Sequence, residues 1–287
     1  MSYGAMALVK RFFRIQYVSN LHLECYEKAV FPLLVKPAAR YLALAGDIGH
    51  PGHPVFESFL RYASDNWDHV IYVPGTKEFS CGKPVHETHV NLIASTERYP
   101  NIHYLHHYRP TFTTKENVVI LGATLWPKNE HYPNIKVQRV ESPSIPQGSA
   151  STLGPPITHE VNEESRTMLE AQIRFRHTQK QSICMLTHHM PSIQLLSSRF
   201  ITGLKNNRYV SDCEDLMIPP VKAWIYGRTH NVSTGMLNGV FTAVNARGYP
   251  NETVPGFTPT AYLEFPVEQS DVEIDLELAK SAYETPI

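Results

Sequence analysis

The sequence predicts an α/β fold, and two observations support that prediction. Short apolar runs, each ending in a loop of Gly, Asp, Asn or His, recur along the chain, as expected for central strands covered on both faces. Segments with helical spacing and a Pro or Thr near their start lie between these runs. Strands that alternate with helices favour a layered α/β domain.

The individual elements follow from the same patterns. Five runs combine a strand with the polar loop after it: residues 13–22, 40–49, 69–78, 182–191 and 222–230. The predicted helices are residues 54–67, 84–99 and 158–177. Beyond Gly227 the apolar residues alternate, and the dipeptide Asn238-Gly239 between two such segments predicts a β-hairpin. A β-rich second half therefore closes the domain.

The length of 287 residues suits one domain, which we place at residues 1–265. Residues 127–158 form a Pro/Ser/Gly-rich insertion that is too long for an ordinary connection. A substrate lid, a partner-binding loop and an inert insertion are all consistent with its composition. Residues 266–287 form an acidic tail, which we expect to be a solvated or partner-docked helix.

Composition excludes several classes of protein. A net charge of −1 gives the chain no bulk electrostatic reason to bind nucleic acid, and no segment approaches the ~20 apolar residues that cross a bilayer. The cysteines lie far apart without CxxC pairing, which predicts reduced thiols in an intracellular, cytoplasm-like compartment: Cys25, Cys81, Cys184 and Cys213. The N-terminal stretch is basic and lacks acids, so an organellar transit segment is the alternative to a first core strand.

Polar side chains follow each of the five predicted strands. They are Asn20 and His22, Asp47, Thr76 and Lys77, His188 and His189, and Arg228 and His230. Because ligands bind where the carboxyl ends of strands meet in layered α/β folds, we expect one converging polar site. We expect other histidines at the surface, namely His86, His89, His103, His106 and His107.

The order and surroundings of these loops resemble the calcineurin-like metallophosphoesterases, in particular a bacterial and phage-type subgroup, over nearly the whole chain. Further matching blocks are LGATLW at 121–126, YVSDCEDL at 209–216 and NARGYP at 245–250. The resemblance implies an αββα sandwich of two mixed β-sheets flanked by helices. It also implies phosphoester hydrolysis by two metal ions, held by the motifs DxH, GDxx, GNHE, a His after a strand, and GHxH.

Several residues of this pattern are exchanged in the chain. Asn20 stands where the resemblance implies a metal-binding Asp, Thr76 where it implies an Asn ligand, and Arg228 where it implies the first His of GHxH. Lys77 replaces the His that assists catalysis, so no catalytic residue is assigned. The metal ligands that remain as candidates are His22, Asp47, His188 and His230.

Arg228 is the most damaging exchange, because a guanidinium cannot deprotonate to bind a metal. At ~4 Å from a divalent ion its charge costs roughly 8 kcal/mol at an effective dielectric of about 20. Lys77 adds a second cation. We therefore expect no cofactor, and we expect Asp47 to cap a helix while it pairs with Arg228 in place of the missing metal charge.

These exchanges predict a catalytically degraded protein, a pseudoenzyme, that serves as a structural or protein-binding subunit with a protein partner or a larger assembly. One alternative is a metal-dependent phosphoester hydrolase with a single Zn or Mn ion on the four remaining ligands. Another is a sensor that binds phosphate or a nucleotide without turnover through Lys77, Arg228, Arg247 and Asn245, although Arg247 is equally able to anchor its own loop.

Overall fold

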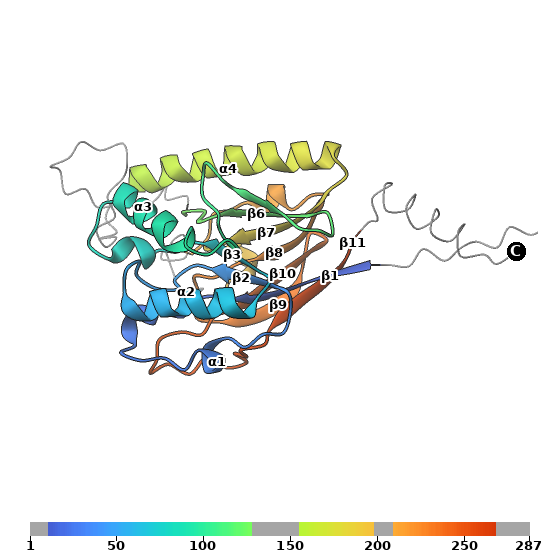
Figure 1. Cartoon of the computed structure of the whole chain (residues 1–287). Coiled ribbons are helices and arrows are strands. Elements are labelled where there is room, and N and C mark those ends of the chain that lie inside the picture. The colour runs from blue at the N-terminus through green and yellow to red at the C-terminus, as the bar shows by residue number, and fades with distance from the viewer. Residues whose placement is uncertain (1–10, 128–154, 198–208, 268–287) are drawn as a thin grey trace, which may run out of the picture.

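Two mixed β-sheets stack face to face, and helices cover their outer faces (Figure 1). The computed structural model describes residues 11–127, 155–197 and 209–267. The first sheet has the order β11-β1-β2-β3-β4. Its strands are β1 Arg11–Val18, β2 Tyr41–Ala45, β3 His69–Val73, β4 Ile102–Tyr104 and β11 Tyr262–Val267.

The second sheet has the order β5-β6-β7-β8-β10-β9. Its strands are β5 Thr111–Thr113, β6 Val118–Ala123, β7 Ser182–Thr187, β8 Val221–Ile225, β9 Val232–Leu237 and β10 Val240–Asn245. The α-helices are α1 Phe31–Leu34, α2 Pro54–Asn66, α3 Val85–Thr96 and α4 Pro155–Thr178. Helices α2 and α3 pack on the first sheet and α4 on the second, which gives the αββα sandwich (Figure 1).

Burial of β2 on both faces explains why its sequence is apolar without interruption. Tyr41, Ala43 and Ala45 lie between the two sheets, in a core to which β3, β6, β7 and β8 also contribute. Leu42 and Leu44 point the other way, into the layer packed against α2. A strand buried on both faces needs apolar residues at every position, so β2 shows no alternation in its sequence.

Parallel pairing brings the carboxyl ends of the central strands to one edge of the sandwich. β1, β2 and β3 pair in parallel in the first sheet, and β6, β7 and β8 do so in the second. The two sheets are tied at this edge because Ser19 N donates to Asn245 O at 3.1 Å and Arg247 N donates to Ser19 O at 3.0 Å. The five predicted polar loops therefore lie on the same side of the molecule.

The structure confirms the five strands that precede polar loops and the hairpin at Asn238-Gly239, where both residues have positive φ. It also confirms the N-terminal run as a core strand from Arg11. Helix α4 begins at Pro155, so the last four residues of the predicted insertion 127–158 are helical. The remainder of that insertion at 128–154, and the acidic tail from residue 268, lie outside the described residues.

Two expectations from composition concern thiols and membranes. All four cysteines are free thiols, and Cys184 and Cys213 are buried. Across residues 11–127, 155–197 and 209–267, no helix has the length and apolar character that crossing a membrane requires.

Candidate functional site

The loops after β1, β2, β3, β7 and β8 bring the predicted polar residues together at one edge of the sandwich. Asn20 N donates to Gly46 O at 3.0 Å, which joins the first two loops. Gly75 passes so close to Asp47 that a Cβ at this position would overlap the Asp47 carboxylate and lie 2.7 Å from His188 Cε1. Glycine is therefore required where the loop after β3 crosses the site.

Four of the motif residues have left-handed backbone conformations. The φ angles are 53° at Asn20, 50° at His22, 53° at Asp47 and 71° at Arg228. Side chains with a Cβ adopt this region rarely, at a cost of order 1 kcal/mol or more each, and such residues cluster at functional sites. The left-handed backbone is thus present also at Asn20 and Arg228, the two positions where the resemblance implies an Asp and a His.

Hydrogen-bond donors surround the buried carboxylate of Asp47. Oδ1 accepts hydrogen bonds from Lys77 N at 2.8 Å and Thr76 Oγ1 at 3.2 Å, and Oδ2 accepts one from Asn20 Nδ2 at 3.2 Å. Burial alone would raise the pKa of Asp47, but the neighbouring imidazoles, the Arg228 guanidinium and the Lys77 N–H together lower it below its ordinary value. Asp47 is therefore an ionised carboxylate whose two oxygens both accept hydrogen bonds.

Arg228 reaches Asp47 through Thr76. Its Nη1 donates to Thr76 Oγ1 at 3.0 Å, and the Thr76 hydroxyl donates in turn to Asp47. The expected pairing of Asp47 with Arg228 is replaced by a link through the Thr76 hydroxyl, and the Arg228 charge helps to lower the pKa of Asp47. The expected helix cap by Asp47 is not at α2, whose N-cap is His53. The Asp47 side chain instead accepts the N–H of Lys77, the residue that precedes the short 3-10 helix Glu78–Ser80.

His188 presents a free nitrogen to this carboxylate. Its Nδ1 lies 2.9 Å from Ala45 O and donates to it, while burial lowers the pKa of His188 against the opposing charge of Asp47. Its Nε2 lies 3.4 Å from Asp47 Oδ1. Within the described part of the chain this Nε2 has no hydrogen-bond partner, and neither has Oδ1 of Asn20.

His22 and His230 form a pair of imidazoles beside the Asp47 cluster. Their Nε2 atoms lie 3.0 Å apart, while Nδ1 of His22 faces Glu24 and Nδ1 of His230 faces Glu252. When each Nδ1–H donates to its carboxylate, the two Nε2 lone pairs point at each other, an arrangement in which both could bind one metal ion. Tyr249 stacks on His22 with ring centroids 4.2 Å apart and holds the ring in place.

Asn245 and Arg247, which the sensor hypothesis assigned to an anion, are engaged in anchoring loops. The Asn245 amide donates to Tyr17 O and Thr258 O, and the residue is buried. Arg247 Nη1 donates to the carbonyl oxygens of Glu252 and Tyr249. Arg228 is linked to Asp47 through Thr76 and also packs against the Tyr209 ring, while the Lys77 ammonium lies 5.8 Å from the centroid of the Tyr249 ring.

Sequence reasoning missed four residues that shape the site: Glu24, Glu78, Tyr249 and Glu252. Glu24 follows His22 by two positions and Tyr249 lies in the NARGYP block, so a signal was present for both. Glu252 lies between Asn251 and Thr253 of a glycosylation-like triplet, and nothing in that stretch indicates a histidine partner. Glu78 lies in the motif GTKE, but its role depends on contacts with two loops that the sequence does not reveal.

The residues fit a two-metal centre poorly. Two nitrogens bound to one ion at about 2.1 Å lie about 2.9–3.4 Å apart, so the pair His22 and His230 has suitable spacing for a single ion. Among the described residues, however, no group of three or more His, Cys, Asp and Glu side chains is arranged to hold a metal ion. The hydrogen bonds to Asp47 and the charge of Arg228 oppose a second ion.

Comparisons with known proteins agree with the fold. No family model matches the chain. Uncharacterized protein L509 of Acanthamoeba polyphaga mimivirus is 27% identical over 275 residues, which cover 87% of this chain and 96% of L509. The crystal structure of the phosphopantetheinyl hydrolase PptH from Mycobacterium tuberculosis matches with a TM-score of 0.61 and 15% identity, over 82% of this chain and 89% of PptH. The chain therefore has the two-sheet sandwich fold of the metallophosphoesterase-like type.

Proposed function

We propose that the protein is a catalytically degraded metallophosphoesterase-like protein that acts as a structural or protein-binding subunit. The observation that carries this proposal is the state of Asp47, at the position that would bridge two metals. Its oxygens accept hydrogen bonds from Asn20, Thr76 and Lys77. A carboxylate has about four lone-pair sites, so three donors leave little for metal ions.

The charges at the site support the same proposal. Arg228 and Lys77 supply fixed positive charge in the neighbourhood where divalent ions would lie, and a guanidinium does not lose its proton. Loss of hydrolysis leaves the fold intact because the strands depend on burial of their side chains, while the loops carry chemistry separately. A stable scaffold without turnover is suited to binding another protein.

The test is to restore the motif residues. The variant Asn20→Asp, Thr76→Asn, Lys77→His and Arg228→His is compared with the parent by metal analysis after incubation with Mn²⁺ or Zn²⁺ and by hydrolysis of bis(p-nitrophenyl) phosphate. We expect no turnover by the parent and a gain of bound metal and turnover in the variant. Circular dichroism checks that both are folded.

Two results would contradict the proposal. One is a parent protein that retains about two ions per chain, the number that a two-metal site requires. The other is parent turnover that disappears in Asp47→Ala. A folded variant that gains neither metal nor activity would place the defect outside the four exchanged positions.

A second candidate function is phosphoester hydrolysis with one Zn or Mn ion between His22 and His230. The spacing of 3.0 Å between their Nε2 atoms and the carboxylate behind each ring favour it. When bound, such an ion would supply a Lewis acid for a phosphate oxygen or a water molecule. Glu24 and Glu252 would orient the two rings.

This candidate is tested by Zn²⁺ titration followed by thermal unfolding. A single site predicts a Tm that rises with Zn²⁺ in the parent and no longer rises in His22→Gln or His230→Gln. His177→Gln, at the exposed end of α4, is the matched control. An equal Zn²⁺ response in all four proteins would exclude this pair as the site.

A further inference from the structure

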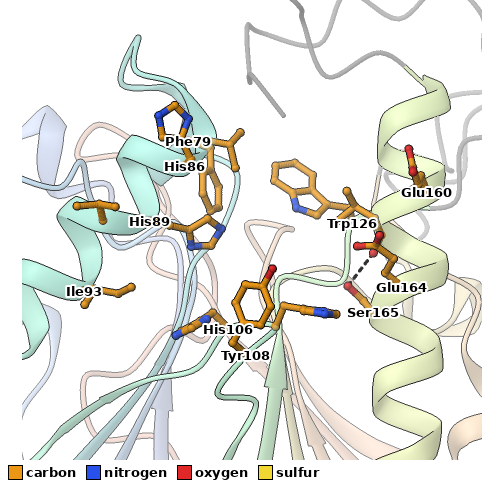
Figure 2. Close-up of a pocket in the computed structure, with 14 residues that line it drawn as sticks. Phe79, His86, His89, Ile93, His106, Tyr108, Trp126, Glu160, Glu164 and Ser165 are labelled. Carbon is orange, nitrogen blue, oxygen red and sulfur yellow. Dashed lines mark hydrogen bonds between the residues drawn. The ribbon is translucent and has the colours of Figure 1, made fainter. Parts of the chain in front are cut away.

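A cavity of about 510 Å³ opens between α3 and α4, close to the polar site but formed by other residues (Figure 2). Phe79 and Trp126 pack together at its inner wall, with ring centroids 5.8 Å apart. Trp126 also contacts the ring of His189, the neighbour of His188. The volume falls in the range of about 300–1,000 Å³ that is usual for small-molecule sites.

Aromatic and imidazole rings dominate the lining of this cavity. Figure 2 shows Trp126 and Tyr108 reaching into the space between the two helices, with His89 opposite on α3. Tyr108 is 90% exposed, so its ring is accessible to a ligand, and it contacts the ring of His107 at a centroid distance of 5.1 Å. Of the five histidines expected at the surface, His86 and His107 are exposed, whereas His89, His103 and His106 are half-buried.

The charge of the lining is negative. Glu160 and Glu164 lie one turn apart on α4, and in the part of the chain that the structure describes neither forms an ion pair. No Lys or Arg lies among the described residues that line the cavity. Burial lowers the pKa of His89 to about 4, and its Nδ1 lies 2.6 Å from Tyr104 Oη, so this imidazole is neutral near pH 7.

We propose that the cavity binds a small organic cation, an ammonium group carried on an apolar body. The faces of Trp126 and Tyr108 attract a cation through their π electrons, and Glu160 and Glu164 supply the opposite charge. A nucleotide fits less well, because its phosphates would meet two carboxylates and no cation. This inference does not depend on the loss of hydrolysis proposed above, because none of these residues is a candidate metal ligand or an exchanged motif position.

The test compares choline with 3,3-dimethylbutan-1-ol, which has the same shape without the charge. The full-length protein, labelled with ¹⁵N-tryptophan, is titrated with each probe while the indole N–H signal of Trp126 is followed. A cation–π site predicts that choline binds roughly tenfold more tightly than the neutral alcohol. AMP serves as the nucleotide probe.

Matched variants identify the groups responsible. Glu160→Gln with Glu164→Gln should weaken choline binding by roughly tenfold, whereas Glu163→Gln, on the same helix but outside the cavity lining, should leave it unchanged. Tyr108→Ala should weaken binding and Tyr108→Phe should preserve it, because the ring face is retained. Since Tyr108 is exposed, neither change threatens the fold.

Several results would overturn the proposal. Equal affinity for choline and the neutral alcohol would identify a purely apolar cavity. Stronger binding of AMP, or choline binding that is insensitive to the double Glu variant, would exclude the role of the two carboxylates. The absence of any saturable shift of Trp126 with choline would exclude a cation site at this cavity.

Discussion

The carboxylate of Glu78 accepts a hydrogen bond from the backbone N–H of Asp47, at 3.1 Å. The same side chain accepts the N–H groups of Ile48 and Gly75, both at 2.8 Å, and the hydroxyl of Tyr72 at 2.7 Å. Burial and the charge of Asp47 raise the pKa of Glu78, while the bonds from Tyr72 and Ile48 oppose that rise. One buried acid thus fixes the loops after β2 and β3 relative to each other.

Glu78→Gln should therefore destabilise the protein strongly. The amide NH₂ of Gln would face backbone N–H donors and leave them unsatisfied, which costs about 3 kcal/mol or more for a group with this many partners. Urea unfolding measures the change in free energy. Glu87→Gln, which removes only the exposed ion pair with Lys83, should change it by less than about 0.5 kcal/mol. Equal effects of the two variants would contradict the proposed role of Glu78.

Gly75→Ala should destabilise the protein and disturb the Asp47 contacts. Its new methyl group would overlap the Asp47 carboxylate, and forced overpacking of this kind costs about 1–3 kcal/mol. Gly235→Ala in β9 is the matched control, because its Cβ would meet only Thr242 Oγ1, at 3.8 Å. Thermal unfolding should give a lower Tm for the first variant and an unchanged or higher Tm for the second. A neutral Gly75→Ala would show that the loop can move away from Asp47.

Stability should fall as the pH is lowered from about 6.5 toward 4, because of two half-buried histidines, His103 on β4 and His89 on α3. Burial lowers the pKa of His89 and of His103 to about 4. Because the folded pKa lies below the unfolded one, the unfolded chain binds more protons in this window and stability is lost. Each such proton steepens the dependence by about 1.4 kcal/mol per pH unit.

The measurement is urea unfolding at several pH values. His89→Gln, which keeps a hydrogen-bonding group near Tyr104, should flatten the curve between pH 6.5 and 4, and the exposed His177→Gln should not. Curves of identical slope for the parent and His89→Gln would contradict this assignment.

The sequence allowed prediction of the central strands because their burial on both faces leaves continuous apolar runs, as in β2 and β7. It did not indicate β4 and β5, which have three residues each and whose pairing depends on neighbouring strands. It also missed β6, although this strand is buried at every position. Motif positions located the loops of the site correctly. Contacts between the loops could not be predicted from the sequence. The hydroxyl of Thr76 links Arg228 to Asp47, and Glu24 and Glu252, which lie 2 and 22 positions after His22 and His230, orient the two imidazole rings.

The left-handed backbone at Asn20, His22, Asp47 and Arg228 has a consequence for protein design. Substitutions at positions 20 and 228 would change side chains on a main chain that already has a conformation which ordinary residues avoid. A metal site engineered at this edge of the sandwich would therefore need side-chain changes at a few positions and no insertion or deletion in the loops.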